Sequence, residues 1–364
     1  MKIPEIFTIE GTPYDLDELK EWCRKTHHTS TIPGWKKEIA EFIGLFIESG
    51  GQPVFQKTSG TTGSPKEYVL HRESMIRSAR RTLNFFKLKK EDRALLCLPM
   101  KYVAGKLMVV RALVGELDLL MVEPTSRPLK DLGTSVAFAA MAPLQVHESL
   151  KSGDSLSLIE KLVIGGGELN RFVEKQLEEL EKPLIYESFG MTETYTHFAL
   201  RQINGAHPQR EFKLLEGVVI GKDSRECLQV DVPGVTMGTV TTNDQVEMNR
   251  AGDGFRWLGR IDNVINSGGI KINPKMLEEK LELLLGHPCL LLSEEDIKLG
   301  NRLVLMVEYG GSKFPGEEWA RLMKKHLSHF EVPKRVVVVN GIPRNRSYKP
   351  DRLAARKLLS TIYL

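Results

Sequence analysis

Short apolar runs alternate with helical patterns between about residues 94 and 189, and this alternation limits the possible folds more than any other feature of the sequence. Buried strands of a parallel sheet read this way, because helices cover both faces of such a sheet. We predict strands at residues 94–98, 117–122, 136–140, 162–164 and 184–188. The helices predicted between and after these strands lie at residues 106–114, 144–152 and 170–181. Open sheets of this kind bind ligands where a strand turns into a helix.

The sequence changes character twice after this region. Residues 211–258 contain short β runs broken by Gly, Pro and Asn, such as 228–232 and 238–242, which predict an appended and less regular β layer. The sequence from about residue 261 onward predicts a compact α+β domain. Its helices are predicted at 275–285 and 317–328, and its strands at 290–292, 303–309 and 336–339.

The length of 364 residues exceeds the usual size of one core and predicts two domains. The predicted fold class is α/β. We expect a large N-terminal α/β domain with layered sheets and the appended β layer at residues 1–260. A small mobile C-terminal α+β domain is expected at residues 261–364.

The composition excludes several classes of protein. The 51 basic and 47 acidic residues are interspersed and give a net charge of only +4, which is too little to predict nucleic-acid binding. The four cysteines show no CxxC spacing and the nine histidines form no ligand cluster beyond His27 and His28, so neither a zinc site nor a disulfide framework is expected. No run is long enough to cross a bilayer, and residues 1–17 carry acidic residues and no apolar core segment. We therefore expect a cytoplasmic protein without membrane insertion.

A loop rich in hydroxyls and glycines follows the apolar pair Val54 and Phe55. Its glycines let the backbone approach an anion closely, its hydroxyls and amides supply donors, and its lysine adds positive charge. Because Ser64 and Pro65 separate the lysine from the last glycine, the loop is not a Walker A motif. Taken alone, its composition also fits a polar surface turn. The residues predicted to hold phosphate are Thr58, Ser59, Gly60, Thr61, Thr62, Gly63 and Lys66.

Residues 186–194 place a Thr and a Glu where a buried strand ends in a glycine turn. Glu193 can hold Mg²⁺ there, because this ion prefers hard oxygen ligands that it shares with substrate phosphates, and Thr192 offers a hydroxyl to phosphate. A plain strand end with a helix-capping Thr is the alternative.

Two further clusters are weaker signals. The glycines at 165–167, followed by Glu168, let the backbone pack flat against a planar ring. Asp244 comes at the predicted end of a strand, where a carboxylate can accept both hydroxyls of a ribose. By itself that segment is equally an ordinary β-turn.

Two segments of the C-terminal part also stand out. Residues 259–272 run from the end of the β layer to the start of the C-terminal domain, and a linker of this kind can serve as a hinge. Residues 343–352 present Lys349 from a loop, although an exposed lysine is usually only solvated surface.

Taken in order, these clusters resemble the adenylate-forming superfamily of acyl-CoA synthetases, adenylation domains and luciferases, over residues from about 54 to 356. The resemblance implies that residues 58–66 form the phosphate loop and that Gly166, Gly167 and Glu168 pack against adenine. It also implies that Thr192 touches the α-phosphate and that Glu193 binds Mg²⁺. ATP, Mg²⁺ and coenzyme A are the implied cofactors.

The resemblance assigns roles in the C-terminal part as well. Asp244 would bind ribose, Arg260 would contact ribose or phosphate, and Asp262 would be the hinge residue. Lys349 falls where the family keeps its adenylation lysine. Gly268 and Gly269 would lie beside a pantetheine tunnel after the C-terminal domain rotates, because glycines leave room there.

The chain departs from the family pattern at three of these positions. Asn243 replaces the usual Gly of the ribose motif, and Phe189 replaces the commoner Tyr. Tyr348 replaces the Gly before the lysine, and together with Pro350 it can restrict the loop and slow either half-reaction. None of these changes removes a reacting group. The chain is also shorter than typical members, and in this it resembles the o-succinylbenzoate CoA ligases of menaquinone synthesis.

The acyl pocket implied by the resemblance lies beside residues 98–105, with later walls near Gly190 and His197. A dianionic acid such as o-succinylbenzoate would need a cation for its unreacted carboxylate. Arg111 is the preferred candidate because its planar fork grips a carboxylate in two places, with a solvated helix face as the alternative. Tyr102 can stack on an aromatic ring, and His197 can stack or hydrogen-bond a keto group. Both can equally be core residues.

The leading prediction is an ATP-dependent carboxylate–CoA ligase that works through an acyl-adenylate, with o-succinylbenzoate as the acid. A second hypothesis is an adenylating enzyme that loads another acid onto CoA or a carrier protein. A third is a non-catalytic acyl-adenylate binder, but the retained Lys349, Glu193 and Asp244 argue against it.

Overall fold

The computed structural model of the chain describes residues 4–48, 53–57, 67–297, 299–311, 314–345 and 349–362. The chain divides into two compact units. The larger unit holds residues 1–220, 230–240 and 251–254, and the smaller unit holds residues 221–229, 241–250 and 255–364. The expected boundary between residues 260 and 261 concerns a hinge and stays a prediction.

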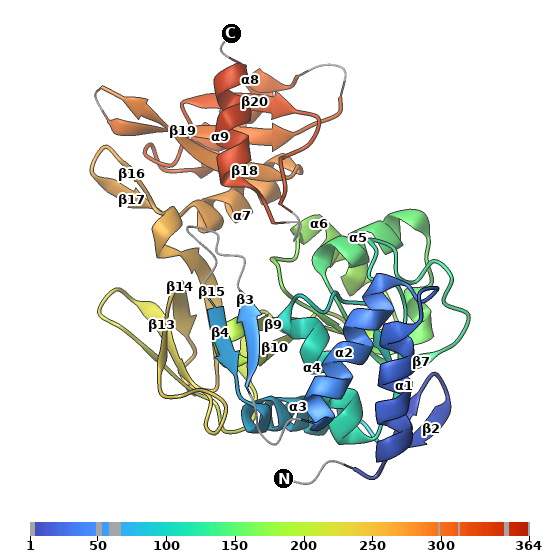
Figure 1. Cartoon of the computed structure of the whole chain (residues 1–364). Helices are drawn as coiled ribbons and strands as arrows, with labels where there is room; N and C mark the ends of the chain where they lie inside the picture. The colour runs from blue at the N-terminus through green and yellow to red at the C-terminus, as the bar shows by residue number, and fades with distance from the viewer. Residues whose placement is uncertain are drawn as a thin grey trace. The chain divides into compact units, whose positions relative to one another are not determined.

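The larger unit alternates strands and helices along its sequence (Figure 1). Its N-terminal elements are β1 Ile6–Ile9, β2 Thr12–Asp15, α1 Leu16–His28, α2 Gly34–Glu48, β3 Val54–Lys57, β4 Glu67–Leu70 and α3 Arg72–Phe86. The elements that follow are β5 Arg93–Leu96, α4 Val103–Gly115, β6 Asp118–Met121, β7 Val136–Met141, α5 Pro143–Ser152, η1 Leu156–Leu158, β8 Ile159–Ile164, α6 Arg171–Glu178, β9 Leu184–Gly190, η2 Thr192–Thr194, β10 His197–Gln202 and β11 Phe212–Leu214.

The main sheet of this unit runs in the order β11-β10-β9-β8-β7-β5-β6-β1-β2. The strands from β9 to β1 pair in parallel, whereas β2, β10 and β11 are antiparallel to their neighbours. The predicted strands at residues 94–98, 117–122, 136–140, 162–164 and 184–188 are β5 to β9. Their parallel pairing and the helices α4, α5 and α6 between them confirm the predicted α/β class.

Helices α5 and α6 pack on this sheet through one apolar cluster. Leu162 and Ile185 of the strands meet Val146 of α5 and Leu177 of α6, and all four side chains are buried. The apolar runs of the sequence are therefore strands covered by helices, as the alternation predicted.

The N-terminal segment also contributes to the core of the larger unit. Phe7 is 2% exposed and Ile9 is 3% exposed. Strand β1 pairs in parallel with β6, and alternate residues of a strand face the same side. Two apolar residues at alternate positions, rather than a continuous run, are therefore enough to bury one face of this strand.

Residues of both units make up the strands between residues 219 and 260. These strands are β12 Val219–Lys222, β13 Cys227–Asp231, β14 Val240–Met248 and β15 Gly254–Arg260. Strands β14 and β15 pair antiparallel, with Asp244 opposite Arg260. Asp244 therefore lies inside a strand, and the alternatives of a strand end or a β-turn at this position are both wrong.

The smaller unit contains a sheet of order β18-β19-β20 with helices on both faces. Alternate residues of β18 and β19 pack against α7 and α8 on one face, through Leu291 and Leu305, and against α9 on the other, through Leu290 and Val304. This arrangement confirms the predicted α+β fold. Its elements are η3 Ile261–Asn263, β16 Ile265–Ser267, β17 Ile270–Ile272, α7 Pro274–Leu285, β18 Cys289–Asp296, β19 Gly300–Glu308, α8 Gly316–His326, β20 Arg335–Val339 and α9 Arg352–Thr361.

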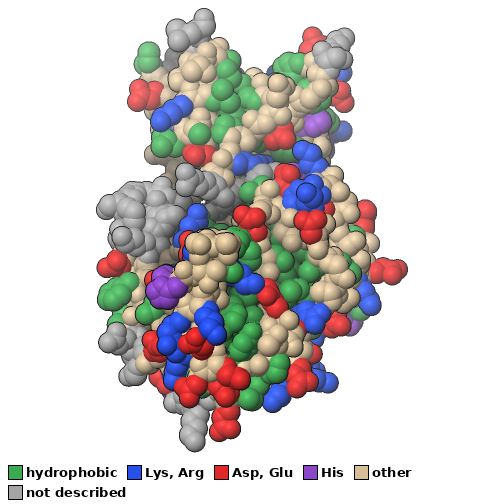
Figure 2. All heavy atoms as spheres, turned by 45° about the vertical axis from the view of Figure 1, so that its right-hand side comes forward, with side chains coloured by type: hydrophobic (Ala, Val, Ile, Leu, Met, Phe, Trp, Pro, Cys, Tyr) green, Lys and Arg blue, Asp and Glu red, His purple; other side chains and the backbone are tan. Residues whose placement is uncertain are grey.

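The visible surface in Figure 2 carries basic and acidic side chains next to one another, in agreement with the small net charge. No helix in the described part of the chain has the length and apolar character needed to cross a membrane. All four cysteines are buried and free.

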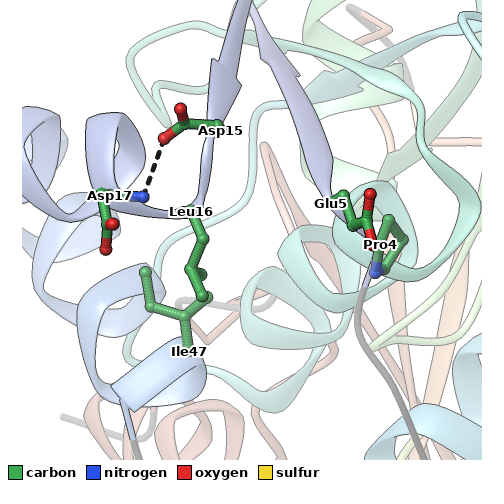
Figure 3. A pocket seen from close by; sticks show the side chains of 6 residues that line it. All are labelled: Pro4, Glu5, Asp15, Leu16, Asp17 and Ile47. Carbon is green, nitrogen blue, oxygen red and sulfur yellow. Dashed lines mark hydrogen bonds between the residues drawn. The ribbon is translucent and has the colours of Figure 1, made fainter.

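A hollow beside the start of α1 is lined by Pro4, Glu5, Asp15, Leu16, Asp17 and Ile47 (Figure 3). Asp15 caps the helix, because its Oδ1 accepts hydrogen bonds from the backbone N–H groups of Asp17 and Glu18, both at 2.9 Å. Asp15 and Asp17 thus serve the N-terminus of this helix. None of the predicted site residues lines this hollow.

Candidate active site

Arg111 of α4 is buried in the larger unit, with 2% of its surface exposed. The alternative of a solvated helix face is therefore wrong. Its Nη2 donates to the Thr196 hydroxyl at 3.3 Å, while its Nε is buried and has no hydrogen-bond partner. Burial lowers the pKa of the guanidinium to about 10, and no carboxylate of the described residues contributes to that shift. A cation in this state can bind an anionic group of a ligand.

Among the described residues, the side chains that interact with Arg111 are those of Thr196 and His197, and both are neutral. The Thr82 hydroxyl lies 3.2 Å from Nε2 of His197, and the Ser78 hydroxyl lies 3.2 Å from that of Thr196. Burial, together with the Arg111 charge, lowers the pKa of His197 well below its ordinary value, so the imidazole is neutral at neutral pH. The larger unit thus brings Arg111 and His197 together, as expected of two residues of one acyl pocket.

Gly190 ends β9 directly opposite His197 of β10. A Cβ atom at Gly190 would lie 2.1 Å from the backbone oxygen of Thr196 and 2.5 Å from Cα of His197. The position therefore requires glycine. The close approach of the two backbones holds the turn with Thr192 and Glu193 next to Thr196 and His197.

Glu193 lies in the short helix η2 after this turn and accepts a hydrogen bond from the Tyr68 hydroxyl of β4. This bond, with a smaller effect of burial, raises the pKa of Tyr68 to about 12. The described residues contain no group of three His, Cys, Asp or Glu side chains that could hold a metal ion. A magnesium ion at Glu193 fits this donor set if phosphate and water oxygens supply its other ligands, as is common for Mg²⁺.

The segment at residues 165–169 follows β8 and packs against β9. Gly166 has a φ of 79°, and a Cβ atom at Gly165 would lie 2.2 Å from the Ser188 hydroxyl. At the end of the segment, the backbone N–H of Leu169 donates to Glu187 Oε1 at 3.4 Å. Gly167 and Glu168 belong to the same turn. This geometry agrees with a flat backbone surface for a planar ring, whose role as the adenine site remains a prediction.

Tyr102 is the N-cap residue of α4, about two and a half turns from Arg111. The Lys101 ammonium lies 5.0 Å from the centroid of the Tyr102 ring. The Lys106 ammonium has other partners than Arg111 has. Its Nζ donates to Gln56 Oε1 at 2.8 Å and to the Met100 carbonyl at 2.7 Å. Of the three cations in this region, Arg111 is therefore the one beside His197.

The phosphate loop at residues 58–66 lies outside the described residues. This statement covers Thr58, Ser59, Gly60, Thr61, Thr62, Gly63 and Lys66. On either side of it, β3 and β4 pair antiparallel, with Lys57 opposite Glu67.

The smaller unit brings together three other predicted residues. Asp244 Oδ2 lies 4.0 Å from Nη1 of Arg260, and Arg260 donates from Nε and Nη2 to the Asp262 carboxylate at 3.0 and 2.6 Å. Burial raises the pKa of Asp244, while the nearby Arg260, Trp257 and Lys349 oppose this rise. The Arg260 hydrogen bonds help to lower the pKa of Asp262. The candidate ribose carboxylate and the candidate hinge residue thus share one arginine.

Asn243, at the usual Gly of the family motif, connects this group to a second arginine. Its Oδ1 accepts from Arg225 Nη1 at 3.1 Å, and its side chain also hydrogen-bonds Asp262. Arg225 is held in turn by Asp223 through its Nε at 2.8 Å. The departure from glycine therefore adds a contact to the candidate hinge.

Lys349 also belongs to the smaller unit, and its charge acts on Asp244. Its backbone N–H donates to Asn345 Oδ1 at 3.0 Å, and its carbonyl accepts from the Asn345 N–H at 2.8 Å. Gly268 and Gly269 lie elsewhere in this unit, in the tight turn between β16 and β17, with φ angles of 60° and 80°. That turn by itself requires glycine, and the role beside a pantetheine tunnel stays a prediction.

Some residues of the site escaped the sequence analysis. Ser78 and Thr82 are buried one turn apart on α3, among apolar neighbours such as Ala79 and Leu83. Polar residues on an otherwise apolar helix face were the available signal. Tyr68 had no such signal, because its contact with Glu193 joins residues far apart in the sequence.

The matches to known proteins decide the family. The AMP-binding enzyme family matches residues 54–227. A protein of Dyadobacter fermentans DSM 18053, described as an acyl-CoA synthetase (AMP-forming)/AMP-acid ligase II-like protein, is 31% identical, with 93% of this chain and 98% of that chain covered and a TM-score of 0.62. This chain belongs to the AMP-binding enzyme family. The predicted membership of the adenylate-forming superfamily is confirmed.

Other AMP-binding enzymes match with lower identity. A 2-succinylbenzoate–CoA ligase of Bacillus mycoides (strain KBAB4) is 27% identical over 337 residues, which cover 83% of this chain and 69% of the relative. The structure of o-succinylbenzoate CoA synthetase from Bacillus subtilis with its acyl-adenylate intermediate has a TM-score of 0.74 at 16% identity, covering 96% of this chain and 94% of that chain. The second match shows that the two proteins share the fold.

Proposed function

We propose that this AMP-binding enzyme activates o-succinylbenzoate as an acyl-adenylate and transfers the acyl group to coenzyme A. The 27% identity with a 2-succinylbenzoate–CoA ligase supports the substrate class. The observation that carries the proposal is the buried Arg111. Burial alone shifts the pKa of its guanidinium, and no carboxylate of the described residues contributes to that shift.

The second carboxylate of a dianionic acid would complete the Arg111 site. A buried guanidinium without an anion is costly, and a bidentate carboxylate would satisfy both its charge and its unpaired Nε–H. The neutral His197 and Thr196 beside it add no competing charge. Monocarboxylic acids would leave the guanidinium unsatisfied, so the pocket would select against them.

The first half-reaction would join the acid to ATP. A carboxylate oxygen attacks the α-phosphorus and expels pyrophosphate, and negative charge grows on the phosphoryl oxygens. The Thr192 hydroxyl would stabilise this charge by donating a hydrogen bond, and the Lys349 ammonium would stabilise it by its positive charge. Glu193, oriented by Tyr68, would hold Mg²⁺, which supplies charge neutralisation on the phosphates when bound. No general base is needed, because the acid reacts as its carboxylate.

The second half-reaction would give the thioester. We propose that the C-terminal domain turns about Asp262, withdraws Lys349 and brings Gly268 and Gly269 to the pantetheine of CoA. The Arg260 and Asn243 contacts of Asp262 would have to hold or rearrange during that turn. A cytoplasmic location is part of the proposal, in agreement with four free thiols.

The test is ATP-dependent pyrophosphate release by the purified protein with o-succinylbenzoate, benzoate, 4-oxo-4-phenylbutanoate and succinate, each with and without CoA. We expect adenylation to be fastest with o-succinylbenzoate and the thioester to form only when CoA is added. Equal rates with the monocarboxylic acids would contradict the proposed substrate. Adenylation without any thioester would favour a carrier protein as the acceptor.

A further inference from the structure

Trp257 of β15 contacts the candidate ribose carboxylate of the smaller unit. Its indole Nε1 donates to Asp244 Oδ1 at 2.9 Å. Asp244 is only 9% exposed, so its charge depends on the donors around it. The nearest arginine is farther away, with Arg260 Nη1 at 4.0 Å from Asp244 Oδ2, and that arginine also donates to Asp262.

A β-bulge brings Trp257 to this position. Gln245 lies opposite Gly259, but Val246 lies opposite Trp257 and not opposite Leu258. In a regular ladder Trp257 would point to the face away from Asp244, because side chains alternate along a strand. The extra residue moves it to the face that Val246 and Asp244 share.

Two neighbours support this arrangement. Gly259 has a φ of 121°, and a Cβ atom there would lie 2.9 Å from Cβ of Lys275, so the bulge requires glycine. The Lys275 ammonium lies 5.8 Å from the centroid of the Trp257 ring. Contacts on the ring and on the adjoining backbone thus fix the direction of the indole N–H.

We infer that Trp257 is a positioning residue that holds Asp244 Oδ1 and thereby presents the remaining acceptor sites of the carboxylate to the ribose hydroxyls of ATP. The inference rests on the proposed function and on the ribose role of Asp244. A carboxylate has about four acceptor sites, so one indole donor leaves enough of them for two hydroxyls.

The experiment compares the binding of ATP, 2′-deoxy-ATP and 3′-deoxy-ATP by calorimetry, together with kcat and KM for ATP. Trp257→Phe keeps an aromatic ring and removes the N–H. We expect its Kd and KM for ATP to rise about tenfold, the effect of losing a hydrogen bond to a charged group. The preference for ATP over the deoxynucleotides should shrink, and kcat at saturating ATP should stay near the wild-type value. Trp22→Phe, in α1 beside Tyr14, is the matched control and should change none of these quantities.

Each other outcome has a defined meaning. If the wild type distinguishes ATP from the deoxynucleotides and Trp257→Phe does so equally well, the inference is wrong and the proposed function stands. An equal loss for all three nucleotides would mean a general structural role and would also overturn the inference. If the wild type binds no ATP at all, the proposed function fails first and the inference fails with it.

Discussion

Two arginines, one near each end of strand β10, have opposite surroundings: Arg111 is fully buried and Arg201 is partly buried. At the end that begins with His197, Arg111 meets the threonine hydroxyl of Thr196 and a neutral imidazole nearby. Toward the other end, Arg201 donates from Nε to Glu187 Oε2 at 3.0 Å and from Nη1 to Glu174 Oε1 at 2.7 Å. Strand β10 therefore carries Arg201 with its two carboxylate partners, whereas Arg111 of α4, near the start of this strand, interacts with neutral described residues.

This difference separates structure from binding. A buried arginine with its carboxylates is satisfied within the fold, and removing one partner leaves an uncompensated charge. A buried arginine among hydroxyls costs stability until a ligand supplies the anion. We therefore expect Arg201 to matter for folding and Arg111 to matter for the substrate.

The largest effect is expected for Arg201→Met. The change leaves Glu187 buried without its cation, and breaking a buried pair in this way costs about 3–5 kcal/mol of unfolding free energy. Urea unfolding monitored by circular dichroism measures the loss. The double variant Arg201→Met/Glu187→Leu should regain part of it, because the buried Glu187 carboxylate is then no longer left without its cation. A loss below about 1 kcal/mol for the single variant would remove the contrast between the two ends.

Arg111→Met should leave the unfolding free energy unchanged or higher, because it removes a buried charge that has no carboxylate partner. Its kcat/KM for o-succinylbenzoate should fall. The decrease should correspond to a loss of about 2–5 kcal/mol in transition-state stabilisation, the range for losing one partner of a buried charge pair. Steady-state kinetics with o-succinylbenzoate and benzoate measure the effect, and the rate with benzoate should change little. A large loss of stability with equal losses for both acids would assign Arg111 to the fold.

Lys349→Ala sharpens the comparison with a cation that acts on charge formed only during the reaction. Adenylation should slow by at least ~10²-fold, the scale for losing one preorganised charge donor. Thioester formation from supplied acyl-adenylate should survive. Separate assays of pyrophosphate release and of thioester formation distinguish the two steps, and equal losses in both would refute the assigned role.

The smallest effect concerns pH. The pKa of His197 is depressed in the folded state, so below about pH 6.5 the unfolded chain binds a proton that the folded chain does not. This residue therefore lowers stability as the pH falls from 6.5, by at most about 1.4 kcal/mol per pH unit, and contributes no slope above that pH. His197→Gln should lose less stability than the wild type between pH 7 and pH 5, as measured by urea unfolding. Parallel curves for the two proteins would show that His197 is not held neutral.

The sequence predicted the central part of the fold because its signals there are local. Strands β5 to β9 each contain a short apolar run. Asn170, which caps α6 by accepting from the Phe172 N–H at 2.8 Å, is a typical start residue of a helix. The β1 strand was missed, because it depends on pairing with a strand more than a hundred residues away. The position of Asp244 inside β14 was missed for a similar reason, since its ladder partner is Arg260.

For the candidate site, the sequence indicated which residues to consider but not which other residues surround them. Arg111 was a candidate on chemical grounds, but its hydrogen bond goes to Thr196, just before β10, and Thr196 in turn contacts Ser78 of α3. The Trp257 contact depends on a one-residue bulge that no composition signal marks. Lys349 was found by its position in a family motif, whereas its backbone exchange with Asn345 appears only in three dimensions.

The anchoring of Lys349 has a mechanical consequence. On one side its backbone is bonded to Asn345, and on the other Arg352 donates to the Glu278 carboxylate at 2.8 and 3.0 Å and to the Leu291 carbonyl at 2.6 Å. Because these hydrogen bonds hold the backbone on both sides of Lys349, the distance that its ammonium can reach is set by the length of its aliphatic side chain. If Lys349 stabilises the phosphoryl charge as proposed, a side chain one methylene shorter should fall short of that charge even though it keeps its own.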